Sequence, residues 1–329
     1  MGTDTARSRM WRNGNLEAEN FSLDKAGEFL TDPDCVVWVD LVRPGAGELD
    51  EIAEQFSLDA HAVEDALSRN ERPKAVRYPR HVFLTVNPIH YDVDEVELRV
   101  GRVSAFGTDQ ALITVRLDDV LDMDAVVQRW DDNSGLIKYG PHALFHGLLD
   151  EVVDRYYDTL EDIDEAVESV EDLLFDDQRQ SEHEVSRRTF RLRRALVDAR
   201  HAVLPMREVV GTITRRAIAA EHSEELGPYW DDLNDHVLRV VEWTDSLRDA
   251  ITSIFDTNMS LADTRMNVIM KKLTSWAAII AVPTAITGYF GQNVPYPGFG
   301  KGWGFWLSLV SMVLVAIALY GTFRRKDWL

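Results

Sequence analysis

The segment Gly288-Tyr289-Phe290-Gly291-Gln292-Asn293-Val294-Pro295-Tyr296-Pro297 separates two apolar runs near the end of a 329-residue chain. The runs, 273–290 and 303–323, contain no ionisable side chain other than tyrosine. Each has roughly the 20 residues that a helix needs to cross the hydrocarbon core of a bilayer. The sequence therefore predicts two membrane spans, joined by a short loop at 291–302.

Basic residues around the two spans predict their orientation. Lys271 and Lys272 precede the first span, a basic tail at 324–329 follows the second, and the loop holds only Lys301. Because positive charge is concentrated on the cytoplasmic side of membrane proteins, both termini are expected in the cytoplasm and the loop outside the cell membrane. The first fifteen residues have no apolar centre and do not resemble a signal peptide.

The N-terminal part mixes strand-like and helical patterns. Strand-like runs occur at 36–39, 82–86, 100–106 and 111–116, and one helical stretch occurs at 48–56. This mixture predicts an α/β or α+β cytoplasmic domain over residues 1–141. Cys35, the single cysteine, lies in a predicted strand and is expected to be a buried, reduced thiol.

The pattern becomes helical after Pro141. Apolar residues recur at intervals of three and four over 142–175, and a second helix is predicted over 181–221, so residues 142–228 are expected to form a cytoplasmic helical hairpin. Gly227-Pro228 is expected to separate this hairpin from a third helix. No glycine precedes Gly288 and no proline precedes Pro283 in 229–290, which predicts a long stalk helix that continues into the first span.

Small and polar residues follow one face of this third helix at alternating steps of four and three. They are Asp256, Ser260, Asp263, Asn267, Met270, Thr274, Ala277, Ala281, Thr284 and Gly288. In a soluble coiled coil the same seam would hold leucine, isoleucine or valine. The face is therefore predicted to line a water-filled axis at which several copies of the helix meet. The alternative is that the small residues let membrane helices pack closely.

The net charge of the chain limits the kinds of molecule that it can bind. The formal net charge of −21 argues against binding nucleic acid and favours cations. Fifteen acidic residues against two arginines lie between Asp150 and Glu184, which fits either a solvated helix face or a belt that attracts cations. Rings of carboxylate and amide oxygens suit a hydrated Mg²⁺ ion, which gives up its water reluctantly.

An enzymatic function has no support in the sequence. It contains no nucleophile-and-base motif and no glycine-rich loop for a nucleotide phosphate. Among the histidines, His142 and His146 are spaced by four, but they lack the glutamate of a zinc protease motif. We expect neither an enzyme nor a nucleotide-binding protein.

Several segments resemble the CorA magnesium transporter family. Near the C-terminus they are 267–274, Pro283 and 289–293, which is similar to the Gly-Met-Asn signature of that family. In the N-terminal part they are 38–41, 64–66 and 72–74. The resemblance extends over nearly the whole chain, and it implies a homopentamer with a cytoplasmic funnel, an α+β N-terminal domain and two C-terminal transmembrane helices.

The resemblance also implies roles for individual residues. Gly291, Gln292 and Asn293 would form the outer mouth, where Asn293 meets the hydrated cation first. Asp256 and Asn267 would bind ions along the pore, while Met270 and Leu273 would form a hydrophobic constriction. Asp232 would supply one carboxylate of a regulatory Mg²⁺ site between subunits. The second carboxylate of this site would come from the neighbouring subunit. The sequence offers four candidates for it, namely Asp92, Asp94, Asp118 and Asp119.

By this resemblance the transported ion is Mg²⁺, with Co²⁺ as a second ion, and cytoplasmic Mg²⁺ regulates the flux. Two departures from the family pattern concern the mouth: Gln292 stands where methionine is usual, and the loop 294–302 has no acidic residue. Zinc transporters of the ZntB type share the fold and vary the signature, so zinc is an alternative ion. A membrane-anchored acidic sensor or scaffold without transport is the alternative of a different class.

Overall fold

The structure is a computed structural model that describes residues 6–68, 71–174, 179–217, 223–292 and 294–329. The chain divides into two compact units, Met1–Ile254 and Phe255–Leu329. The boundary between the units falls inside one helix, α9 (Ser223–Phe290). The helix continues without a break from the first unit to the end of the first predicted span, as the sequence predicts.

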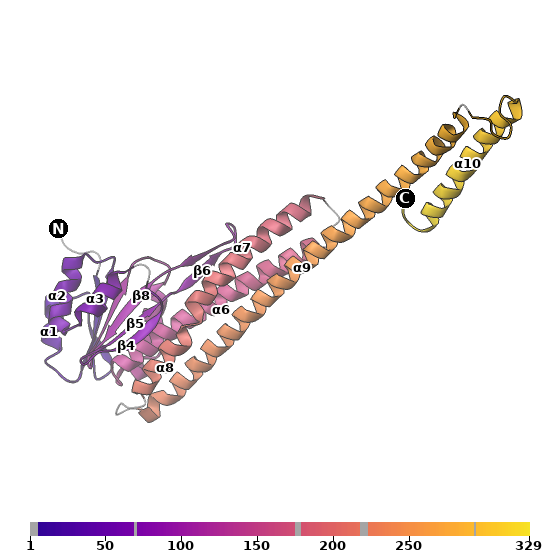
Figure 1. Cartoon of the computed structure of the whole chain (residues 1–329). Helices are drawn as coiled ribbons and strands as arrows, with labels where there is room; N and C mark the ends of the chain where they lie inside the picture. Colours follow the sequence, from indigo (N-terminus) through magenta and orange to yellow (C-terminus); the bar gives the residue numbers. More distant parts are fainter. Residues whose placement is uncertain (1–5, 69–70, 175–178, 218–222, 293) are drawn as a thin grey trace. The chain divides into compact units, whose positions relative to one another are not determined.

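A seven-stranded sheet forms the centre of the first unit (Figure 1). Its strands follow the spatial order β2-β1-β3-β9-β8-β5-β4, and only the central pair β3 and β9 is parallel. The strand bounds are β1 (Ala6–Arg12), β2 (Asn15–Glu19), β3 (Cys35–Val42), β4 (Lys74–Arg77), β5 (Val82–Val86), β8 (Val103–Gly107) and β9 (Ala111–Arg116).

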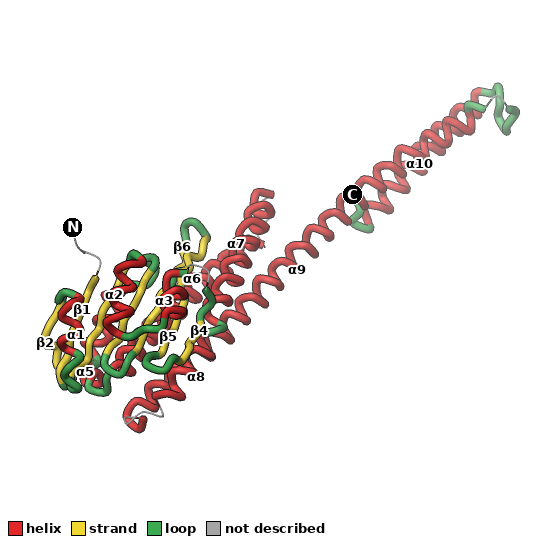
Figure 2. Tube along the Cα trace, turned by 60° about the vertical axis from the view of Figure 1, so that its left-hand side comes forward, coloured by secondary structure: helices red, strands yellow, loops and turns green. Residues whose placement is uncertain are grey.

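Helices cover both faces of this sheet (Figure 2). Alternate residues of β3 point to opposite faces, so Val37 and Val39 pack in one core while Val36 and Trp38 pack in the other. This is why the strand reads as a continuous apolar run. Three helices contribute to the first core, α1 (Leu23–Phe29), α2 (Ala46–Phe56) and α3 (Ala60–Leu67). The second core includes α4 (Met123–Asp132), the short α5 (Ser134–Ile137) and the long α6 (Pro141–Leu174).

The long helices of the first unit share the second core. The predicted helix over 142–175 is confirmed as α6, because its apolar residues keep one face buried along its whole length. A separate hairpin, β6 (Ile89–Asp92) and β7 (Glu97–Val100), packs on α6. The Tyr156 hydroxyl donates a hydrogen bond to the Asn87 carbonyl (2.9 Å), and the Thr159 hydroxyl donates one to the Ile89 carbonyl (3.2 Å).

The structure corrects three local predictions. The helix predicted over 181–221 is two helices, α7 (Arg179–Val203) and α8 (Met206–Ala217), because Pro205 cannot donate a backbone hydrogen bond and restricts Leu204 before it. Gly227-Pro228 lies inside α9 rather than before it, near the start of the helix, where a proline removes only one bond. The strand predicted over 100–106 is divided between β7 and β8.

The second unit contains the end of α9 and helix α10 (Gly302–Arg325), which lie side by side in both views (Figures 1 and 2). Both helices are long and apolar enough to cross a membrane, and almost none of this apolar surface is buried within the chain. Two apolar helices that expose nearly all of this surface are typical of membrane spans and not of a soluble core. The two predicted spans are thus the C-terminal part of α9 and α10.

Candidate functional site

The predicted pore residues form an exposed row on α9. From Phe255 onward the second unit exposes every residue that the sequence assigns to the pore, including Leu273. The exposed set comprises Asp256, Ser260, Asp263, Asn267, Met270, Leu273, Thr274, Ala277, Ala281, Thr284 and Gly288. The single chain therefore leaves this face free for water or for further copies.

The opposite face of α9 contacts the second span. Its covered residues follow a helical spacing of three and four, from Ser275, which is fully buried, through Ile279 and Val282 to Ile286. At 100° per residue this covered face lies roughly opposite Ala277, Ala281 and Thr284. The small residues of the predicted pore row therefore do not serve to pack the two spans of one chain together.

Small residues on α10 make that packing possible. Gly304 is buried, and Ser308 and Ser311 are half-buried on the same face. A Cβ added to Gly304 would lie 2.5 Å from the carbonyl oxygen of Gly298, so no larger residue fits at the start of α10. Small residues of this kind let membrane helices approach closely. Within one chain the α9 row thus takes no part in packing the two spans, and close packing of its small residues stays an alternative for contacts between copies.

The α9 row extends further toward the N-terminus than the sequence prediction proposed. Continuing the same steps of four and three through the first unit gives seven more exposed positions, namely Asp232, Asp235, Arg239, Glu242, Ser246, Asp249 and Ser253. Asp232 thus belongs to the same series of exposed positions, although at 100° per residue it lies about 120° around the helix from Asp256. The four-and-three spacing that marks these positions continues unchanged in the sequence. That they are exposed follows from the structure, in which Leu233, Val237 and Val240 on the opposite face are buried.

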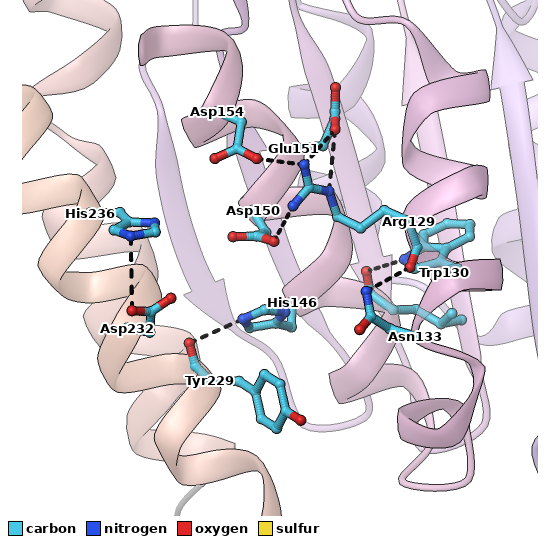
Figure 3. A network of polar contacts seen from close by, with 11 residues as sticks. Arg129, Trp130, Asn133, His146, Asp150, Glu151, Asp154, Tyr229, Asp232 and His236 are labelled. Atoms are coloured by element: carbon cyan, nitrogen blue, oxygen red, sulfur yellow. Dashed lines mark hydrogen bonds and ion pairs between the residues drawn. The ribbon is translucent and has the colours of Figure 1, made fainter.

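A cluster of possible cation ligands lies beside Asp232 (Figure 3). One ligand atom from each of Asp150, Asp154 and His236 lies within 4.8 Å of the others. The two carboxylates are one turn apart on α6, and the imidazole comes from α9. The His236 Nε2 atom lies 3.8 Å from Oδ1 of Asp232, and within the described chain the Nδ1 atom of His236 is buried without a hydrogen-bond partner.

The ligand atoms of this cluster suit a divalent cation, but the Arg129 guanidinium already occupies the same carboxylates. Carboxylate oxygens suit Mg²⁺, whereas an imidazole nitrogen suits ions such as Zn²⁺ or Ni²⁺. Arg129 on α4 already forms ion pairs with Asp150, with Glu151 (2.9 Å) and with Asp154 (2.5 Å). Burial alone would lower the pKa of Arg129, but the carboxylates outweigh it and raise the pKa. A cation at this cluster would share its carboxylates with a fixed guanidinium charge.

A small cavity of about 160 Å³ adjoins the cluster, and its lining includes His146, Asp150, Tyr229 and Asp232. The His146 Nε2 atom lies 3.1 Å from the Tyr229 carbonyl oxygen, and its ring packs edge-on against Trp230. Burial lowers the pKa of His146, which the nearby Asp150 offsets in part. The pair His142 and His146 thus has no shared ligand role in this geometry, because His146 belongs to the contact between α6 and α9.

The four candidate partners of Asp232 differ in their surroundings. The Asp118 carboxylate accepts hydrogen bonds from the backbone N–H groups of Arg102 (2.8 Å) and Val120 (3.1 Å). Asp92 accepts from the N–H groups that follow it in the β6–β7 turn. Asp119 pairs with Arg99 (3.2 Å), and Asp94 is exposed. The choice among them stays open, because the proposed contact involves a second copy.

The predicted mouth lies at the end of α9. The Gly291 N–H donates to the Thr287 carbonyl (2.8 Å), and Gln292 is exposed. Asn293, for which the outermost ion contact is predicted, lies outside the described residues. The adjoining loop is held by the Tyr296 ring, which packs against the rings of Phe290 (5.0 Å) and Phe299 (5.3 Å).

The family follows from this fold and from the sequence together. The description "CorA-like Mg2+ transporter protein" matches residues 34–325, so the chain belongs to that family. A family of transporters agrees with the prediction that the chain is not an enzyme.

Individual relatives support the same assignment. The chain is 28% identical to the cobalt/magnesium transport protein CorA of Thermotoga maritima, over 95% of this chain and 92% of the relative. The complete structure of the CorA magnesium transporter from Methanocaldococcus jannaschii has the same fold, with a TM-score of 0.76, 22% identity and full coverage of both chains. The full-length CmaX protein matches with a TM-score of 0.74 and 20% identity over 99% of each chain. The ZntB cytoplasmic domain from Vibrio parahaemolyticus matches with a lower TM-score of 0.53 and 14% identity over 79% of this chain, so the zinc alternative has less support.

Proposed function

We propose that the chain forms a homopentamer in the cell membrane and conducts hydrated Mg²⁺ passively, with Co²⁺ as a second substrate. One observation carries the proposal: the polar and small row of α9 is exposed on the face opposite α10. Five copies that turn this row inward enclose a path lined by Asn267, Thr284 and the backbone of Gly288. The T. maritima relative, whose name specifies cobalt and magnesium transport, supports the choice of ions.

The driving force is electrical. An inside-negative potential contributes about 2.3 kcal/mol per elementary charge per 100 mV, hence roughly 4.6 kcal/mol for a divalent ion. With both termini in the cytoplasm, the mouth at Gly291, Gln292 and Asn293 faces outward and receives the cation with its water shell. Amide and hydroxyl oxygens then bind the ion through its waters, since Mg²⁺ is dehydrated reluctantly.

Regulation belongs to the same proposal. Cytoplasmic Mg²⁺ bound at Asp232, together with a carboxylate of the neighbouring subunit, screens the acidic subunits from one another and holds the path closed. Loss of that ion lets the subunits repel. Asp150, Asp154 and His236 lie close enough to Asp232 to take part in the same site.

Flux into liposomes tests the proposal. Purified chain reconstituted with a Mg²⁺-sensitive dye inside should admit Mg²⁺ under an inside-negative potential. Hexaamminecobalt(III), a rigid mimic of the hydrated ion, should block that flux, and Asn293→Ala should abolish it. An intact oligomer that conducts neither ion would contradict the proposal and favour a membrane-anchored scaffold.

A further inference from the structure

The outward face of α7 carries basic and apolar side chains at alternating intervals of three and four. This α7 row consists of Arg187, Phe190, Arg194, Val197 and His201, together with Leu204 directly after the end of the helix, all exposed. Its three apolar members, spaced by seven, are 70%, 43% and 45% exposed. The other side of α7 already packs in the core through Val185, Leu192 and Leu196. A helix that covers one face of a core needs no second apolar row, so the folding of a single chain does not account for it.

The outward face of α6 carries a matching row of acids. This α6 row consists of Asp158, Glu161, Glu165, Glu168 and Asp172, all exposed and again spaced by three and four. It lies on the side of α6 away from Ile163 and Val167, which are buried. Among the described residues, neither these five acids nor Arg194 forms an ion pair, while Arg187 pairs with Glu184 at 3.2 Å. Both rows are therefore available to a partner.

The two rows are complementary in charge and in repeat. Helices α6 and α7 are joined through residues 175–178 alone and run antiparallel within one chain. An α6 helix of a neighbouring copy can approach α7 in the same antiparallel direction. It then places Glu165 opposite Arg187 and Asp158 opposite Arg194, because the two arginines and the two acids are each seven residues apart. Phe190 then lies over the aliphatic stem of Glu161. Helical rows of this spacing pack with axes about 20° apart, and the α7 row is roughly 25 Å long.

We propose that the α7 row binds the α6 row of a second copy of this chain. The contact is head-to-tail, since each copy offers one row to each neighbour, and such contacts form a ring when the rotation between copies closes, as the proposed homopentamer requires. It also pairs opposite charges between subunits that each carry a net charge of −21 and would otherwise repel. The interface uses surfaces apart from the ion path. An anionic membrane surface would also attract the arginines of α7, but it offers no counterpart to the seven-residue repeat of α6.

Cross-linking between separately tagged full-length chains tests the contact. In a Cys35→Ser background, one chain carries Arg194→Cys, and the other carries Asp158→Cys, Glu165→Cys or Asp172→Cys. After joint reconstitution, a short bis-maleimide should join the two tags best at Asp158→Cys, less at Glu165→Cys and least at Asp172→Cys, and the Asp158→Cys yield should be about five times that of the control Arg207→Cys on α8. Yields equal to the control, in an oligomer of unchanged native mass, would overturn this interface and leave the proposed ion path standing.

Charge reversal supplies the second measurement. Arg187→Glu with Arg194→Glu should lower the temperature at which the oligomer dissociates in detergent, and Asp158→Lys with Glu165→Lys should do the same. Combining all four changes should restore the dissociation temperature. If the double variants were merely misfolded, the combination would not restore it. Failure of the combination to restore the oligomer contradicts the pairing. Shielding of Arg194→Cys from maleimide only in vesicles with anionic lipid, without cross-links, would identify a lipid surface and overturn the proposal.

Discussion

The imidazole of His236 and the carboxylate of Asp232 face one another one turn apart on α9, with 3.8 Å between Nε2 and Oδ1. Asp232 is exposed and belongs to the same helix as Thr284 and Gly288. This relationship links the proposed regulatory site to the proposed conduit through one continuous helix.

Replacing Asp232 by lysine should make transport less sensitive to internal Mg²⁺. The lysine ammonium substitutes for the bound cation's charge but cannot bridge two carboxylates. We expect the Mg²⁺ concentration for half-inhibition to rise roughly tenfold, equivalent to about 1.4 kcal/mol. The measurement is flux into liposomes at graded internal Mg²⁺, with Asp231→Lys on the adjacent exposed position as the control. Equal inhibition of both variants would exclude Asp232 from the site.

His236 should distinguish between ions at this cluster. Because imidazole binds Co²⁺ and Ni²⁺ more readily than Mg²⁺, His236→Ala should weaken inhibition by internal Co²⁺ more than inhibition by internal Mg²⁺. The ratio of the two half-inhibition concentrations is the measured quantity. An unchanged ratio would show that the imidazole contributes no ligand.

The pH dependence of stability should depend on His146. Burial lowers its pKa in the folded chain, so as the pH falls through about 6.5 the unfolded chain takes up a proton first. The contribution of His146 to stability is therefore present above that pH and is lost below it. His146→Gln should reduce the fall in Tm between pH 7.5 and pH 5.5. A fall as large as that of the unchanged chain would argue against this assignment.

The buried ion pair of Asp40 and Arg116 should be important for stability. Asp40 is fully buried, its Oδ2 lies 2.6 Å from Nη2 of Arg116, and it accepts a hydrogen bond from the Thr114 hydroxyl (2.7 Å). Asp40→Asn leaves a buried guanidinium without its counter-charge, which typically costs about 3–5 kcal/mol. Thermal unfolding should show a clear decrease in Tm.

The exposed ion pair of Arg99 and Asp119 provides the control for this change. Exposed pairs contribute about 0–1 kcal/mol, so Asp119→Asn should leave the Tm nearly unchanged. If both variants lowered the Tm by the same amount, burial of the Asp40 pair would not be the cause.

The elements that the sequence predicted correctly are those with a sustained pattern. The periodicity over 142–175 corresponds to α6, and the absence of helix breakers before Pro283 corresponds to the unbroken α9. The break at Pro205 was missed because apolar residues continue on both sides of it. The division at Gly101 was missed because only tertiary contacts require it: an added Cβ there would lie 2.5 Å from side-chain atoms of Asp118 and Val120.

The candidate site likewise has a part that could be predicted from the sequence and a part that could not. The α9 row could be predicted, since its members share one helix and one spacing. The cluster of Asp150, Asp154 and His236 could not, because folding brings together two helices about eighty residues apart in the sequence. The only sequence signal was two pairs spaced by four, one on α6 and one at Asp232 and His236, and such pairs are common on acidic helices.

Two threonines on α9 provide the most direct test of the central claim, which is that the exposed row of α9 lines the ion path. Thr284 and Thr287 each donate a hydroxyl hydrogen bond to the carbonyl four residues earlier, at 3.0 Å. Only Thr284 lies on the row. The measurement is Mg²⁺ flux into liposomes for Thr284→Leu and Thr287→Leu in oligomers of equal native mass. We predict at least a tenfold loss for Thr284→Leu and near-normal flux for Thr287→Leu; equal flux in the two variants would contradict the account.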